Sequence, residues 1–192
     1  EDFDAKTLQP LLDRLAAFKP DVITIEAISG EGCDLLARFP DVYDPTNVGH
    51  GLLLVSNDDR VRAGTGFSTH PHQDMEIVTW VLSGRLEHKD SEGNHGEIYP
   101  GLAQRMSAGS GIWHSEMNPS PTEDVHFVQM WVLPDTPRID PGYQQLDINA
   151  ELDRGGLQPI ASGQGHDAAI TIRQRDAVLW GGRLRPGEVV EV

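Results

Sequence analysis

The chain has 192 residues, with 30 acidic and 15 basic side chains that give a formal charge of −15, and a single cysteine, Cys33. This charge would repel the phosphate backbone of a nucleic acid, so the composition disfavours direct nucleic-acid binding. One cysteine cannot form an internal disulfide, the N-terminus lacks the regions of a signal peptide, and no apolar run approaches the roughly 18 residues of a membrane helix. We therefore expect a soluble, cytoplasmic protein of one large domain or two small ones.

The first part of the chain predicts one helix. Between residues 7 and 19 the apolar side chains recur at helical spacing, and Thr7 can cap the start. Pro20 ends this pattern, and the β-branched residues at 22–25 then predict a short strand.

After residue 47 the sequence predicts β-structure. Short apolar runs at residues 52–55, 77–82 and 127–133 are separated by turn clusters at 56–59, 90–94 and 100–101. Strands at such regular spacing indicate a sandwich or a barrel. A connecting segment is predicted for residues 134–165, with a short helix near 149–152, and further strands are predicted at 169–172, 177–180 and 187–192.

Two short motifs predict a metal site: His70-Pro71-His72 and His114-Ser115-Glu116. In a strand, residues i and i+2 point to the same face, so each motif aims two ligating side chains in one direction. Three neutral imidazoles and one carboxylate suit a divalent first-row metal such as iron, copper, nickel, manganese or zinc. The candidate ligands are therefore His70, His72, His114 and Glu116.

Neighbouring residues leave one alternative open. Glu76 has the same strand parity as His70 and His72, so either Glu76 or Glu116 could supply the carboxylate. The glycine pairs at residues 64–66 and 109–111 lack the third glycine of a dinucleotide loop and predict tight turns. Surface or hydrogen-bonded positions are predicted for the remaining histidines, which are His50, His88, His95, His126 and His166.

These motifs resemble those of a known family. Gly64-x5-His70-x-His72-x3-Glu76 resembles the first cupin motif, and Gly111-x2-His114-x3-Asn118 resembles the end of the second, with Ser107 where that motif generally has proline. More specifically, the runs GTGFSTHPHQDMEIVTWVLSGRLEHKDSEGN and RMSAGSGIWHSEMNPS are similar to the pirin family, of the bacterial type. The resemblance is strong from about residue 43 to 145 and weak from there to the end.

The resemblance implies a mainly β protein built from cupin barrels, which are double-stranded β-helices of the jelly-roll type. Pirins are bicupins with one metal, usually iron, in the N-terminal barrel. The family's ligand positions correspond here to His70, His72, His114 and Glu116, which favours Glu116 as the carboxylate ligand. Glu76 would then be a neighbour of the ligands or a pocket residue.

The resemblance also implies a division of the chain. Residues 1–42, with the predicted helix and strand, form an N-terminal segment unlike a pirin N-terminus; residues 43–134 form the metal-binding barrel; and residues 135–192 form a linker and a partial C-terminal cupin. Because the second barrel is incomplete and no initiator methionine is present, we expect a truncated or recombined chain. Its unpaired strand edges need a cover from the N-terminal segment or from another subunit.

Several bacterial pirins resemble quercetin 2,3-dioxygenases, whereas animal pirins act as nuclear transcriptional cofactors. The resemblance therefore implies a dioxygenase that cleaves a flavonol such as quercetin with O₂ at one divalent metal, most simply iron, with Glu116 as both ligand and general base. The alternative is a non-catalytic metal-sensing or redox-sensing module that binds a protein partner. Cupin-type isomerase chemistry at the same site is a third possibility.

Overall fold

The computed structural model describes residues 51–167, 170–186 and 189–190. Residues 52–192 form a compact unit of their own, and the fold described below is that of this unit. The helix and strand predicted at residues 7–19 and 22–25 lie outside the described residues. Within the described part, no helix is long and apolar enough to cross a membrane.

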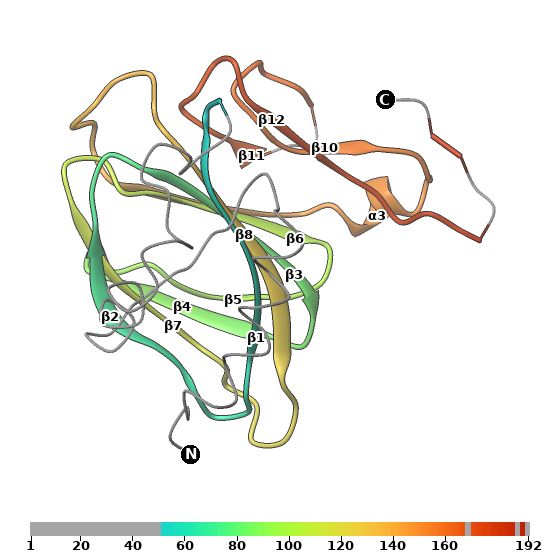
Figure 1. The fold of residues 1–192 in the computed structure, drawn as a ribbon, viewed down its shortest axis with the longest axis horizontal. Helices are drawn as coiled ribbons and strands as arrows, with labels where there is room; N and C mark the ends of the chain where they lie inside the picture. The colour runs from blue at the N-terminus through green and yellow to red at the C-terminus, as the bar shows by residue number, and fades with distance from the viewer. Residues whose placement is uncertain (1–50, 168–169, 187–188, 191–192) are drawn as a thin grey trace, which may run out of the picture. The chain divides into compact units, whose positions relative to one another are not determined.

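Two antiparallel sheets form a jelly roll of the cupin type, which confirms the predicted fold class (Figure 1). The five-stranded sheet has the order β1-β8-β3-β6-β9, and the four-stranded sheet has the order β2-β7-β4-β5. Their strands are β1 (Leu53–Val61), β2 (Gly66–His72), β3 (Glu76–Ser83), β4 (Leu86–Asp90), β5 (His95–Ile98), β6 (Leu102–Ser107), β7 (Ile112–Met117), β8 (Val125–Val132) and β9 (Gly142–Asp147).

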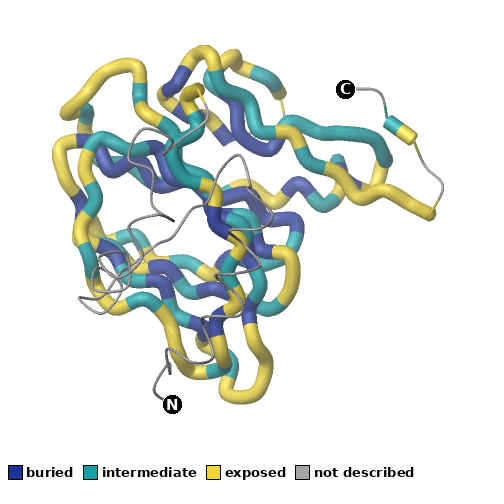
Figure 2. Tube along the Cα trace, viewed as in Figure 1, coloured by how far each residue is buried: buried dark blue, intermediate teal, exposed yellow. Residues whose placement is uncertain are grey.

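Apolar side chains from both sheets fill the space between them. One cluster joins Val81 and Phe127 of the five-stranded sheet to Leu86 and Ile98 of the four-stranded sheet. A second cluster joins Ile77 to Ile112 in the same way. Figure 2 shows that buried residues follow the strands whereas exposed residues gather in the connecting loops. The alternation of side chains along each strand therefore places one face of each sheet in this core.

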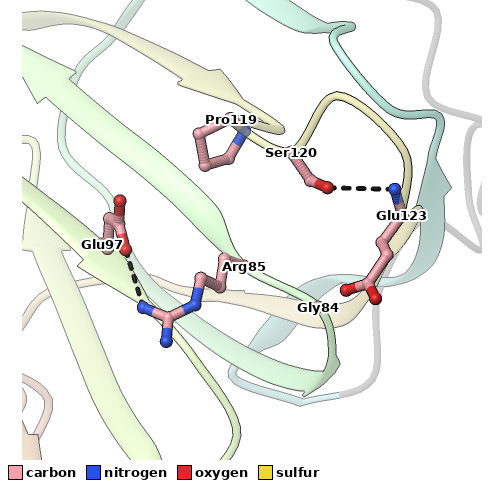
Figure 3. Close-up of a pocket in the computed structure, with 6 residues that line it drawn as sticks. All are labelled: Gly84, Arg85, Glu97, Pro119, Ser120 and Glu123. Carbon is pink, nitrogen blue, oxygen red and sulfur yellow. Dashed lines mark hydrogen bonds and ion pairs between the residues drawn. The ribbon is translucent and has the colours of Figure 1, made fainter.

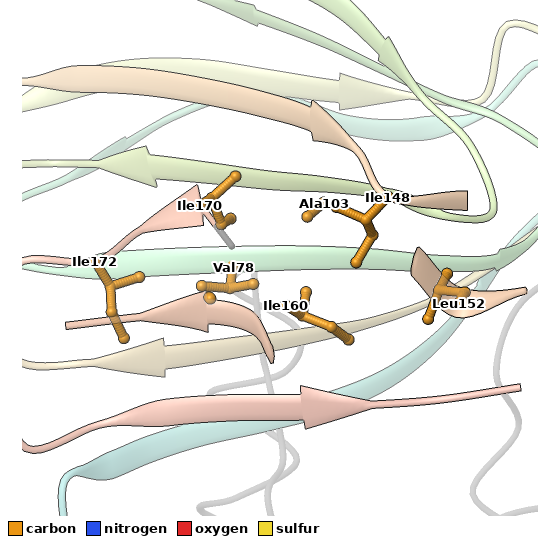
Figure 4. Packing of buried hydrophobic residues seen from close by; sticks show 8 residues of the cluster. Val78, Ala103, Ile148, Leu152, Ile160, Ile170 and Ile172 are labelled. Atoms are coloured by element: carbon orange, nitrogen blue, oxygen red, sulfur yellow. The ribbon is translucent and has the colours of Figure 1, made fainter. Parts of the chain in front are cut away.

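The outer face of the five-stranded sheet is buried as well, beneath a third sheet. This sheet has the order β11-β10-β12, with bounds Gln158–Ser162 for β10, Ile170–Thr171 for β11 and Val178–Gly181 for β12. Together with the short helix α3 (Asn149–Leu152), it covers a cluster made of Val78, Ala103, Ile148, Leu152, Ile160, Ala161, Ile170 and Ile172 (Figure 4). Double burial explains why β3 is almost continuously apolar.

Three of the local predictions need correction. The polar residues at 56–59 form no turn but lie inside β1, an edge strand whose backbone pairs with β8; Ser56 and Asp58 are exposed, whereas Asn57 is buried. The segment predicted as a connection, 134–165, contains β9 and β10 in addition to the predicted helix α3. At the end of the chain, Val189 and Val190 lie in no strand.

The two glycine pairs form turns, as predicted. Gly64, Gly109 and Gly111 have φ angles of 69°, 50° and 140°, which favour glycine. At Gly109 the approach of the backbone adds a second constraint, because a Cβ atom there would lie 2.2 Å from the carbonyl oxygen of Ile139. This turn leads directly into β7 and therefore helps to fix where that strand begins.

The third sheet should contribute measurably to the stability of the jelly roll. Ile160 is 2% exposed between the two layers, so Ile160→Ala should lower the free energy of unfolding by about 2–5 kcal/mol through lost burial and a new cavity. The exposed Leu184, in the same C-terminal part, is the control: Leu184→Ala should change it by less than about 0.5 kcal/mol. Equal effects in chemical denaturation would mean that the third sheet does not pack as described.

Candidate metal centre

Neighbouring strands of the four-stranded sheet bring three of the predicted ligands together. β2 pairs antiparallel with β7, and His70 stands directly opposite His114. The ring centroids of these two residues are 4.4 Å apart, and each lies 4.9 Å from the ring centroid of His72. One ring nitrogen from each of the three histidines lies within 4.8 Å of the others, close enough to share a metal ion.

The hydrogen bonds of these histidines fit a metal site. Nδ1 of His70 lies 2.7 Å from the carbonyl oxygen of Ser68, to which it can only donate, so Nε2 keeps its lone pair. Nε2 of His114 is buried and has no hydrogen-bond partner among the described residues. A buried nitrogen without a partner is unfavourable, and a metal ion would satisfy it. The donor set therefore suits a divalent first-row metal.

Glu116 is 3% exposed and is held by a chain of hydrogen bonds across the barrel. Nε2 of Gln129 on β8 donates to its two carboxylate oxygens at 2.9 and 3.0 Å. Nε1 of Trp131 donates in turn to Oε1 of Gln129 at 2.9 Å. The Trp131 ring also packs edge-on against His72, with centroids 4.8 Å apart. These contacts from the opposite sheet fix the direction of the carboxylate.

Glu116 falls into a second group of possible ligands, which shares His114 with the first. Its carboxylate and the rings of His88 and His114 also have atoms within 4.8 Å of one another. His88, predicted as a surface or hydrogen-bonded residue, is fully buried and hydrogen-bonded. The sequence held one indication of this role: His88 and Asp90 are two residues apart, so their side chains point to the same face of a strand. The pairing of β4 with β7, which brings them to His114, cannot be read from the sequence.

Glu76 lies elsewhere, although the sequence left it open as a ligand. β2 ends at His72, and a turn in which Asp74 has a φ of 51° carries the chain into the five-stranded sheet. There the Glu76 carboxylate accepts a hydrogen bond from the backbone nitrogen of Arg173 at 3.0 Å and lies 4.0 Å from Nη1 of Arg105. The turn breaks the alternation of side chains that began in β2. Glu76 therefore faces the C-terminal segment and not the histidines.

The remaining described histidines agree with their prediction as surface or hydrogen-bonded residues. His95 pairs with Glu87, His126 with Asp58, and His166 with the hydroxyl of Ser162. His50 lies outside the described residues. Within the described part of the chain, His95, His126 and His166 belong to neither of the histidine clusters described above.

Burial keeps the imidazoles of His72, His88 and His114 in the neutral form that binds metals. Burial, reinforced by the neighbouring His70, lowers the pKa of His72 to about 4. Burial also lowers the pKa of His114 to about 2, with smaller contributions from His70, His72 and His88. The pKa of His88 is lowered by burial too, against the opposing effect of Asp90. A metal ion therefore competes with few protons at this site.

The surface also carries a polar hollow of about 580 Å³, which contains none of the candidate ligands (Figure 3). Arg85 and Glu97 form an ion pair of 2.9 Å on its wall, and the backbone nitrogen of Glu123 donates to the hydroxyl of Ser120. Its lining is Gly84, Arg85, Glu97, Pro119, Ser120 and Glu123. Such a charged lining does not suit a flat aromatic molecule.

The lowered pKa of His114 predicts how stability depends on pH. Unfolded imidazoles titrate near 6.5, so below that pH the unfolded chain binds a proton that folded His114 does not. The free energy of unfolding of the metal-free protein should therefore fall as the pH drops from about 6.5 to 4, by up to about 1.4 kcal/mol per pH unit for this group. His114→Gln should give a shallower fall in denaturation curves across this range. Equal slopes would contradict the assignment.

Comparison with known proteins places this chain in a family. The family model described as Pirin matches residues 26–132, starting upstream of residue 43, where the motifs predicted the pirin-like part to begin. A putative quercetin 2,3-dioxygenase of Mycobacterium tuberculosis is 63% identical over 155 residues, which are 80% of this chain and 64% of that protein. The quercetin 2,3-dioxygenase of Escherichia coli is 46% identical over 136 residues, 71% of this chain and 58% of that protein.

Solved structures agree with the sequence comparison. The bacterial pirin YhhW of E. coli, in complex with nickel(II), has a TM-score of 0.63 and 44% identity, over 70% of this chain and 57% of that one. The matched part thus spans less than two thirds of these relatives. Since the family model covers more than half of the 192 residues, the chain belongs to the pirin family.

Proposed function

We propose that this protein holds one divalent metal ion through His70, His72, His114 and Glu116 and uses it to cleave a flavonol such as quercetin with O₂. The convergence of three histidines on one small volume carries the proposal. The E. coli relative is named quercetin 2,3-dioxygenase, the M. tuberculosis relative is named a putative one, and a related pirin structure contains nickel(II). Iron is the proposed native metal, with zinc, copper, nickel and manganese as alternatives.

A metal held here would supply Lewis-acid activation of a phenol and a centre for reaction with dioxygen. The protein's part is to position the ligands and to manage a proton. Glu116 is both ligand and base: one carboxylate oxygen can take the phenolic proton of the substrate. Gln129 donates to both oxygens of this carboxylate, so the group keeps its direction when the proton arrives.

An apolar surface beside the candidate ligands supports an aromatic substrate, which would displace water when it binds. Ile77, Met106 and Ile112 form an apolar cluster in the barrel, and Trp131 packs against it. The same indole contacts His72, so this apolar surface extends to the candidate ligands. Loss of bulk water strengthens the electrostatic effect of the base on the phenol.

The proposed ligand set can be tested first by metal analysis. Protein purified without added metals should contain close to one metal ion per chain, and His114→Ala should lower this content markedly, because it removes one of the four proposed ligands. His95→Ala is the matched control, since His95 is exposed and pairs with Glu87. Full metal content in His114→Ala would rule out this site.

The proposed reaction is tested with quercetin. An anaerobic titration should perturb the flavonol spectrum, and admission of O₂ should consume both reactants. Glu116→Gln keeps the shape of the side chain but cannot take a proton, so kcat per bound metal should fall by about 10²–10⁴. Glu97→Gln, in the surface hollow, is the control and should not change kcat.

A different result would favour the alternative function. If the metal-loaded protein neither perturbs the flavonol spectrum nor consumes oxygen, the enzyme proposal fails. The same metal site would then serve a metal-sensing or redox-sensing module that binds a protein partner. The net charge of −15 is compatible with a basic partner.

A further inference from the structure

Asp90 and His88 form a hydrogen-bonded pair directly behind the candidate ligand His114. Both lie on β4, which pairs with β7 so that Asp90 stands opposite His114 and His88 stands opposite Glu116. The side chains of Asp90 and His88 are 0% exposed. Nε2 of His88 lies 3.0 Å from Oδ2 of Asp90, and Nδ1 of His88 lies 3.4 Å from Nδ1 of His114.

The chemistry of these atoms fixes the direction of each hydrogen bond. An ionised carboxylate can only accept, so Nε2 of His88 carries the proton and Nδ1 of the neutral ring has the lone pair. Nδ1 of His114 must then donate to it. The proton of His114 is thereby held on Nδ1, which leaves the lone pair on Nε2, the atom without a hydrogen-bond partner in the described structure.

Further contacts hold the pair in this arrangement. The ring of Tyr143 stacks on His88, with centroids 4.7 Å apart and planes at 29°. Oδ1 of Asp90 accepts from the backbone nitrogens of Glu92 and Asn94 at 3.0 and 2.9 Å. These bonds anchor Oδ1 in the turn after β4, while Oδ2 faces His88 and also accepts from Nδ2 of Asn94 at 3.0 Å.

We propose that Asp90 and His88 are positioning residues that set the tautomer of His114, so that His114 presents Nε2 to the metal. The proposal rests on the metal site of the proposed function. It explains why a carboxylate and a histidine are both buried beside a ligand histidine, an arrangement that orients ligands in metalloproteins. Neither residue would touch the metal or the substrate.

Asp90→Asn tests the proposal with little change of shape. The amide oxygen can still accept the two backbone hydrogen bonds of the turn, whereas the NH₂ group replaces the acceptor that faces His88. A reversed amide would satisfy His88 but would set NH₂ against two backbone donors. The donor should therefore move the proton of His88 to Nδ1 and that of His114 to Nε2, which blocks the metal-binding lone pair.

Two readouts separate this inference from the proposed function. In the metal-free protein, ¹⁵N NMR of labelled histidine should report the Nδ1–H tautomer of His114 in the native chain and the Nε2–H tautomer in Asp90→Asn. Chelator competition with Zn²⁺ should show affinity falling by about 10–100-fold. A native chain that binds no metal would refute the proposed function, while the tautomer measurement would still decide the role of Asp90.

Control variants exclude a merely structural effect. Glu92→Gln changes an exposed carboxylate of the same turn and should leave the tautomer and the affinity unchanged. His88→Phe keeps a ring against Tyr143 but breaks the connection, so Asp90→Asn should have no further effect on affinity in that background. Should Asp90→Asn fail to fold, His88→Phe alone is decisive, because His114 should then populate both tautomers.

Three results would overturn the proposal. The first is native affinity and an unchanged His114 tautomer in Asp90→Asn. The second is an equal loss of affinity from Asp90→Asn with and without His88. The third is binding of two Zn²⁺ ions per chain with one lost in His88→Phe, which would make His88 a ligand together with His114 and Glu116.

Discussion

The register between β2 and β7 is the constraint on which the candidate metal centre depends. His70 stands opposite His114, and a slip of one residue would turn every side chain of β2 to the other face of the sheet. Two features oppose such a slip. An irregularity in the strand pairing between Phe67 and His70 determines which face of the sheet the histidines of β2 occupy. The turn that ends at Gly111 determines where β7 begins.

The five-stranded sheet supports the site from the other side of the barrel. Gln129 and Trp131 alternate with outward-facing residues of β8, so a single strand both orients Glu116 and joins the core beneath the third sheet. The candidate ligands therefore lie on one sheet while the group that fixes the carboxylate comes from the other. The geometry of the centre therefore depends on how the two sheets pack together.

The sequence was sufficient for the features that depend on neighbours along the chain. The spacing of His70 and His72, and of His114 and Glu116, predicted side chains on common faces, and the turn glycines were found by composition. It was insufficient wherever partners come from other strands. Parity suggested Glu76 as a ligand, but the turn after β2 breaks that parity. The surroundings of His88 follow from the pairing of β4 with β7, and the polar run in β1 is stabilised by pairing with β8.

The contact between Glu76 and Arg173 has a consequence for any shortened form of the protein. The buried carboxylate, at the start of the strand that follows the histidine motif, receives its hydrogen bond from a backbone amide 97 positions further along the chain. Proteolytic trimming ahead of that amide would remove this hydrogen bond and leave the buried carboxylate with Arg105, 4.0 Å away, at a cost of about 1–3 kcal/mol. The C-terminal segment is therefore no removable appendage, because it supplies the hydrogen bond that a buried carboxylate of the barrel accepts.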